Sequence, residues 1–137
     1  MKKIHTILRI IAGLIFTLAG LSKIGITPNM IGRSDMFTPE AFAFISALDA
    51  TGYIFPILGF FALVCGLLIL FNRATAFAAV VMVPITLNFA FLHIFLGLEI
   101  NSIFSFEAAR ESLGFIPLAF NIYILYLHRF KYFILFK

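Results

Sequence analysis

The residues of this chain best suited to chemistry are polar side chains that interrupt long apolar stretches. Thr86, Asn88 and His93 belong to one such stretch, and Asn121 belongs to a later one. A polar or ionisable side chain inside a membrane segment is costly unless it has a partner or a function. Amide and imidazole groups bond to carbonyl oxygens, and imidazole also transfers protons. We therefore predict a polar site at these four residues. No second histidine lies four residues from His93, so we expect neither a haem nor a metal ion there.

Two of the four polar residues belong to a repeated motif. Asn88 follows Pro84 by four residues, and Asn121 follows Pro117 by the same interval, so each pair projects from one helix face. Either the asparagines form interhelical hydrogen bonds of about 1 kcal/mol each, or the two antiparallel segments form an inverted repeat of the kind found in transporters. Around a helix, Asn88 and His93 lie about 140° apart. They face one cleft only if the kink at Pro84 rotates the outer half of the helix.

Two cations and two glycines share one stripe of the first apolar segment. With about 100° per residue, Arg9, Gly13, Gly20 and Lys23 fall within about 80° around a helix. The glycines predict close approach of another helix. The cations either extend to the two membrane interfaces or point into the protein. Residues 53–71 carry a matching small-residue face, which consists of Gly59, Ala62 and Gly66.

Charged residues also collect at the outer ends of the predicted helices. Glu107, Arg110 and Glu111 are spaced as neighbours on a helix surface, where such ion pairs contribute little. Lys23 and Glu99 belong to the same end of the molecule. We therefore expect Lys23 to pair with an outer acid such as Glu111 or Glu99. Together with Arg9 and Arg110, these are the candidate charged residues at the membrane boundaries.

The composition defines the elements that must position these residues. The chain of 137 residues is 63% hydrophobic and only 12% charged, whereas soluble domains carry about 25% charged residues. Four stretches are long enough, or nearly long enough, to cross the bilayer as helices. They span residues 5–25, 53–71, 75–98 and 113–128. The predicted fold is therefore all-α, an integral membrane four-helix bundle that forms one domain over residues 1–137.

A shorter helix is predicted in the first outer loop. Thr38, Pro39 and Glu40 supply a capping hydroxyl, a proline at the first position and an acid in the first turn. The following residues alternate between apolar and polar faces, and Gly52 marks the end. This helix is too short to span a bilayer, so we expect it to lie on the outer membrane surface.

The distribution of charge predicts the topology. One side of the predicted bundle carries seven basic residues, and the other carries three basic residues and all six acidic ones. The positive-inside rule then places both termini in the cytoplasm, with the chain in the bacterial inner membrane. The net charge of +4 follows from this asymmetry and indicates contact with the lipid bilayer rather than with nucleic acid. The basic side consists of Lys2, Lys3, Arg9, Arg73, Arg129, Lys131 and Lys137.

The stripe from Arg9 to Lys23 and the segment PITLNFAFLHIFLG at Pro84–Gly97 resemble the DoxX family of small bacterial membrane proteins. The likeness covers nearly the whole chain. It implies a four-helix membrane bundle, and some relatives are membrane subunits of thiosulfate:quinone oxidoreductase or associate with redox-defence enzymes. The family supplies no agreed catalytic residue. Its more distant cousins resemble the vitamin K epoxide reductase bundle, which works through paired cysteines. Because Cys65 is alone, we expect it to pack as a small apolar residue, without dithiol chemistry.

These observations leave three functions open. The first is a membrane subunit or partner of a redox system, more accessory than enzymatic, with quinone as the ligand of Asn88, His93 and Asn121. The second is a small-molecule or lipid transporter, which would need a homo-oligomer because four helices leave little room for a pathway. The third is a non-catalytic membrane adaptor whose polar groups are satisfied internally. No phosphate-binding loop, zinc motif or nucleophile–histidine–acid pattern supports another enzyme class.

Overall fold

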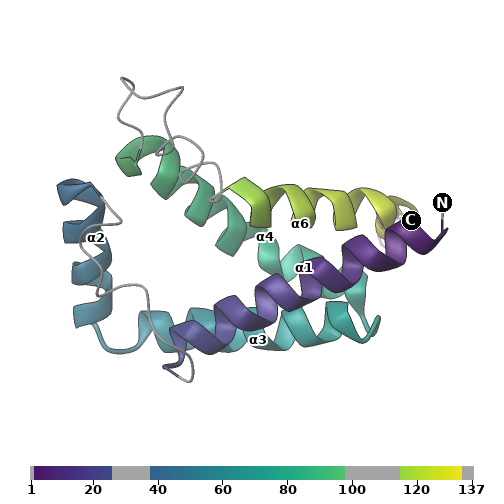
Figure 1. Cartoon of the computed structure of the whole chain (residues 1–137), viewed down its shortest axis with the longest axis horizontal. Helices are drawn as coiled ribbons and strands as arrows, with labels where there is room; N and C mark the ends of the chain where they lie inside the picture. Colours follow the sequence, from purple (N-terminus) through teal and green to yellow (C-terminus); the bar gives the residue numbers. More distant parts are fainter. Residues whose placement is uncertain (1, 26–37, 98–114, 134–137) are drawn as a thin grey trace.

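A computed structural model describes residues 2–25, 38–97 and 115–133, and in these ranges helices joined by short turns are the only regular secondary structure (Figure 1). The all-α class is therefore confirmed. A π turn, η3, continues α4 where the sequence predicts an uninterrupted helix to residue 98. The elements are α1 (Lys2–Lys23), α2 (Pro39–Ala50), α3 (Ile54–Leu70), α4 (Thr75–Leu92), η3 (His93–Gly97), α6 (Ile116–Leu127) and α7 (Arg129–Phe133).

Within the described ranges, two helical segments are long and apolar enough to cross a membrane. They are Lys3–Lys23 and Thr75–Leu96. Helices α2 and α3 are together long and apolar enough to form one further span, but they meet at an angle of 90°. Helix α6 is apolar but shorter. Two or three segments of this kind mark the chain as a membrane protein.

Helices α1 and α3 run antiparallel and touch through their backbones, as the glycine stripe predicts. A Cβ atom added at Gly20 would lie 2.5 Å from the main-chain nitrogen of Leu63. One added at Gly66 would lie 2.5 Å from the main-chain nitrogen of Thr17. No side chain fits in either space, because both neighbours are backbone atoms. Glycine is therefore required on both helices for this close packing.

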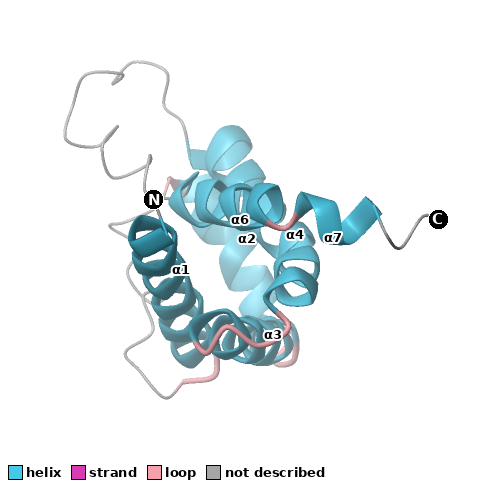
Figure 2. Ribbon diagram, turned by 90° about the vertical axis from the view of Figure 1, so that its right-hand side faces the viewer, coloured by secondary structure: helices cyan, strands magenta, loops and turns pink. Residues whose placement is uncertain are grey.

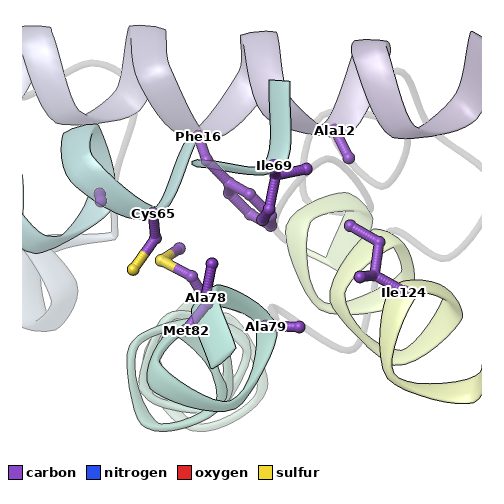
Figure 3. Packing of buried hydrophobic residues seen from close by; sticks show 9 residues of the cluster. Ala12, Phe16, Cys65, Ile69, Ala78, Ala79, Met82 and Ile124 are labelled. Carbon is purple, nitrogen blue, oxygen red and sulfur yellow. The ribbon is translucent and has the colours of Figure 1, made fainter. Parts of the chain in front are cut away.

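The apolar core lies where α1, α3, α4 and α6 converge (Figure 3). Phe16 from α1 and Ile69 from α3 point toward Met82 of α4 and Ile124 of α6, and all four are buried. Cys65 is also buried, and its sulfur faces Met82. This confirms the prediction that the cysteine packs as an apolar residue.

Helix α2 begins and ends where the sequence predicts. The hydroxyl of Thr38 accepts a hydrogen bond of 3.3 Å from the amide of Ala41, and a proline follows at the first helical position. The helix ends at Ala50, and Gly52 adopts a positive φ of 73° in the turn toward α3. This sharp turn sets α2 across the end of the molecule, away from the axis of α3 (Figure 1).

Candidate functional site

Asn121 and Thr86 form a buried polar contact between α6 and α4. The side-chain amide of Asn121 is fully buried and lies 3.1 Å from the hydroxyl oxygen of Thr86. That hydroxyl is also 2.9 Å from the carbonyl oxygen of Met82, one turn earlier in α4. Asn121 therefore makes the interhelical hydrogen bond that the proline–asparagine motif allows.

The Asn121 amide also contacts the backbone of α4 beside Pro84. With the amide nitrogen placed toward acceptors, it donates to the carbonyl of Ala79 at 3.1 Å, and its oxygen accepts from the amide of Val83 at 3.2 Å. The opposite orientation leaves the oxygen facing only acceptors, so the first one is physically preferred. Proline weakens the backbone hydrogen bonding of a helix in the preceding turn. Asn121 thus bonds to backbone groups in the turn before Pro84, although the carbonyl that Pro84 leaves without its helical donor is that of Val80.

Asn88 lies elsewhere, although its motif is the same as that of Asn121. Its side chain is exposed on the outside of α4, whereas Thr86, two residues earlier, is buried against α6. The four polar residues predicted as one site therefore occupy three places. Thr86 and Asn121 are together, and Asn88 and His93 are each separate from that pair.

His93 stands at the junction of α4 and η3, and among the described residues only one of its ring nitrogens has a hydrogen-bond partner. Its Nδ1 lies 2.8 Å from the carbonyl oxygen of Phe89. Because a carbonyl oxygen only accepts, Nδ1 must carry the proton, and Nε2 of the neutral ring then keeps its lone pair. The rings of Phe89 and His93 also meet edge to face, with centroids 4.7 Å apart. This contact fixes the direction in which Nε2 is presented.

Lys23 reaches the same aromatic ring from the end of α1. Its Nζ lies 5.7 Å from the centroid of the Phe89 ring, which is within the range of a cation–π contact. Gly59 of α3 packs against the base of the lysine side chain. The ammonium therefore points across the molecule toward α4 rather than simply outward. Lys23, Phe89 and His93 together are called the outer cluster below.

The backbone beside the outer cluster departs from regular helix. Residues His93–Gly97 form a π turn, a feature often found at functional sites. The hydroxyl of Thr38, which caps α2, donates to the carbonyl of Leu96 in this turn. One threonine thus starts α2 and also joins it to η3.

Arg9 is held inside the molecule at the other end of α1. One of its guanidinium nitrogens donates to the carbonyls of Ile69 and Leu70, at 2.5 and 2.7 Å. These carbonyls belong to the last turn of α3, where the helix dipole favours a positive charge. Of the two alternatives for Arg9, the structure supports the one in which the side chain points into the protein.

A contact between the first and last long helices was not predicted. Nδ1 of His5 and the hydroxyl of Tyr123 share a hydrogen bond, and the two rings stack with centroids 6.0 Å apart. The sequence does carry a signal for it, because His5 precedes Arg9 by four residues and lies on the same stripe of α1. Phe89 was also not predicted as a site residue. Its signal is the same spacing, because Phe89 precedes His93 by four residues and lies on the same helix face.

Glu99, Arg110 and Glu111 lie outside the residues that the structure describes. The expected pairing of Lys23 with Glu111 or Glu99 therefore stays a prediction. Comparison with known protein families, curated proteins and solved structures gives no match for this chain. The likeness to the DoxX family thus rests on the sequence motifs alone.

Proposed function

We propose that this chain is a multi-pass protein of the bacterial inner membrane, with α1, α3, α4 and α6 as a four-helix membrane bundle. The contacts of these helices around one apolar core support this arrangement. In this topology α2 lies on the outer surface and both termini face the cytoplasm. The first turn of α1, which carries Lys3, and the α3–α4 turn, which carries Arg73, lie at the same end of the molecule (Figure 1), and this supports that orientation under the positive-inside rule.

Within this bundle, we propose a role as a membrane subunit or partner of a redox system that contacts quinone. The observation that carries this proposal is the outer cluster. Lys23 supplies a hydrogen-bond donor for a quinone carbonyl, and Nε2 of His93 supplies an acceptor for a quinol hydroxyl. Phe89 offers an aromatic surface between them. A planar ring with oxygen atoms at its ends matches this combination of groups, and the DoxX resemblance supports the same class of ligand.

A quinone titration of the purified chain tests this role. We expect Lys23→Met and His93→Ala each to weaken binding about tenfold, the equivalent of one lost hydrogen bond to a charged or imidazole group. Asn88→Ala is the matched control, because Asn88 is a polar residue of the same helix that lies exposed and outside the outer cluster. Unchanged affinity in both cluster variants would refute the quinone site. Mass spectrometry of the protein extracted from its native membrane should also find bound quinone or a stoichiometric oxidoreductase.

One observation favours a second function, that of a non-catalytic membrane adaptor. Asn121, Thr86 and Arg9 all have protein partners, so these polar groups act as internal ties between helices. In this case alanine variants at Asn121 and His93 would lower stability without changing any ligand or partner that co-purifies. The transporter alternative gains no comparable support, since the two asparagines of its inverted repeat lie in unlike environments.

A further inference from the structure

The end of the molecule at which the chain begins and ends is strongly basic. The N-terminal end of α1, the α3–α4 turn and α7 all lie there, while α2 lies at the opposite end (Figure 1). The two acidic residues that the structure describes, Glu40 and Asp49, are both on α2. The cations at the basic end whose side chains are described and not bonded to α3 are Lys3, Arg73, Arg129 and Lys131, and Lys2 adds a further charge at the start of α1.

Helix α7 turns aside from α6 and runs across this end. Figure 2 looks onto the basic end and shows α7 extending sideways past α4. The hydroxyl of Tyr132 donates to the carbonyl of Ala76, in the first turn of α4, at 2.9 Å. This bond holds α7, which carries exposed Lys131, beside the first turn of α4, and that helix directly follows the turn that carries exposed Arg73. A short helix in this direction lies parallel to a membrane surface if α6 crosses it.

Arg129 is fixed in the same region by two aromatic rings. Its guanidinium carbon lies 4.2 Å from the ring centroid of Tyr126 and 4.5 Å from that of Phe130. It also donates to the carbonyl of Tyr126 at 3.1 Å. Both rings are exposed, and exposed aromatic side chains next to cations are typical of the headgroup level of a bilayer.

We propose that Arg73, Arg129 and Lys131 form a binding surface for the headgroup of an anionic phospholipid. Guanidinium and ammonium groups bind phosphate oxygens through charge-assisted hydrogen bonds. Within the described residues no carboxylate lies at this end to compete for them. The net positive charge selects a lipid that carries net negative charge, such as phosphatidylglycerol, over zwitterionic phosphatidylcholine. This surface lies at the end opposite the outer cluster, so it does not depend on the proposed redox function.

A lipid competition experiment tests the proposal. The purified full-length chain in mild detergent is incubated with equal amounts of phosphatidylglycerol and phosphatidylcholine, and native mass spectrometry counts the lipids retained. We expect a preference for phosphatidylglycerol in the wild type. Arg73→Gln and Lys131→Gln should each lower that preference about fivefold, since one cation near an anionic surface contributes about 1 kcal/mol. The double variant should show little preference.

Lys3→Gln is the matched control. It removes the same charge from the same end of the molecule, but from α1, which lies on the other side from α7 (Figure 2). We expect it to keep the preference of the wild type. An equal loss in Lys3→Gln would show a diffuse effect of net charge and overturn the site, as would unchanged preference in the double variant. Circular dichroism melting should be the same for all variants, because the three altered side chains are exposed.

Discussion

Arg9 of α1 donates a hydrogen bond of 2.7 Å to the carbonyl of Leu70, the last residue of α3. A second bond from the same nitrogen reaches the carbonyl of Ile69. The cation therefore stabilises a helix end with which it is not contiguous in sequence. The negative end of the α3 dipole faces a positive charge, and the last two carbonyls of the helix gain a charged donor.

We expect Arg9→Gln to destabilise the protein by about 2 kcal/mol, the usual range for hydrogen bonds to a charged group. The reason is that two carbonyls in the last turn of α3 lose their charged partner. Denaturant or thermal unfolding in detergent, followed by circular dichroism, measures this change. Arg73→Gln is the control, because Arg73 is exposed. Equal stability of the two variants would show that Arg9 only extends to the membrane surface.

We expect Gly20→Ala to loosen the α1–α3 contact. Alanine gains up to about 1 kcal/mol in helix propensity over glycine, but its Cβ would lie 2.5 Å from a backbone nitrogen of α3. The clash costs about 1–3 kcal/mol and should exceed the gain, because a helix backbone cannot move aside as a flexible side chain can. The unfolding midpoint should therefore fall. Ala19→Gly, at the neighbouring partly buried position, provides a comparison in which only propensity changes. A rise in stability for Gly20→Ala would contradict the close contact.

We expect the two asparagines to respond differently to alanine. Asn121→Ala removes partners from Thr86, Ala79 and Val83 inside the protein, so it should cost about 1–2 kcal/mol. Asn88→Ala changes an exposed residue at the same offset from a proline, so its effect should be close to zero. Chemical denaturation of both variants measures the difference. Equal losses would mean that the buried amide contributes no more than the exposed one.

These predictions show how far the sequence alone determines the molecule. Three features follow from local sequence patterns: helix α2, its Thr38 cap and the glycine contact of α1 with α3. Each of these patterns can be recognised from residues a few positions apart in one segment. The same rules could not separate Asn88 from Asn121. Both follow a proline by four residues, but only one faces another helix, and that depends on the arrangement of the whole bundle. The outer cluster could not be predicted for a related reason. Phe89 differs from the other apolar residues of α4 only because Lys23 of α1 contacts its ring.

Tyr132 should ionise at a higher pH than an unperturbed tyrosine. Burial raises the pKa of its hydroxyl above the ordinary value of 10.0, because the charged form is disfavoured away from water. The folded state thus favours the protonated form, so this contribution to stability is complete below pH 10 and is lost as the pH rises through the folded-state pKa.

Ultraviolet difference spectroscopy can follow this ionisation directly, since the chain has four tyrosines and no tryptophan. We expect Tyr132→Phe to remove an ionisation step that lies above pH 10. It should also loosen α7, because the hydrogen bond to Ala76 is lost. An alkaline titration curve that keeps this step in Tyr132→Phe would contradict the assignment.

The bond between Arg9 and the end of α3 has a consequence for biosynthesis. The ribosome completes α1 well before Ile69 and Leu70 are made, so the guanidinium of Arg9 has no acceptor when α1 first meets the insertion machinery. An arginine without a protein partner is most stable where its side chain reaches the lipid headgroups. We therefore expect the first turns of α1 to stay at the lipid surface until α3 emerges, and to take up their final packing only when the end of α3 supplies the two acceptors.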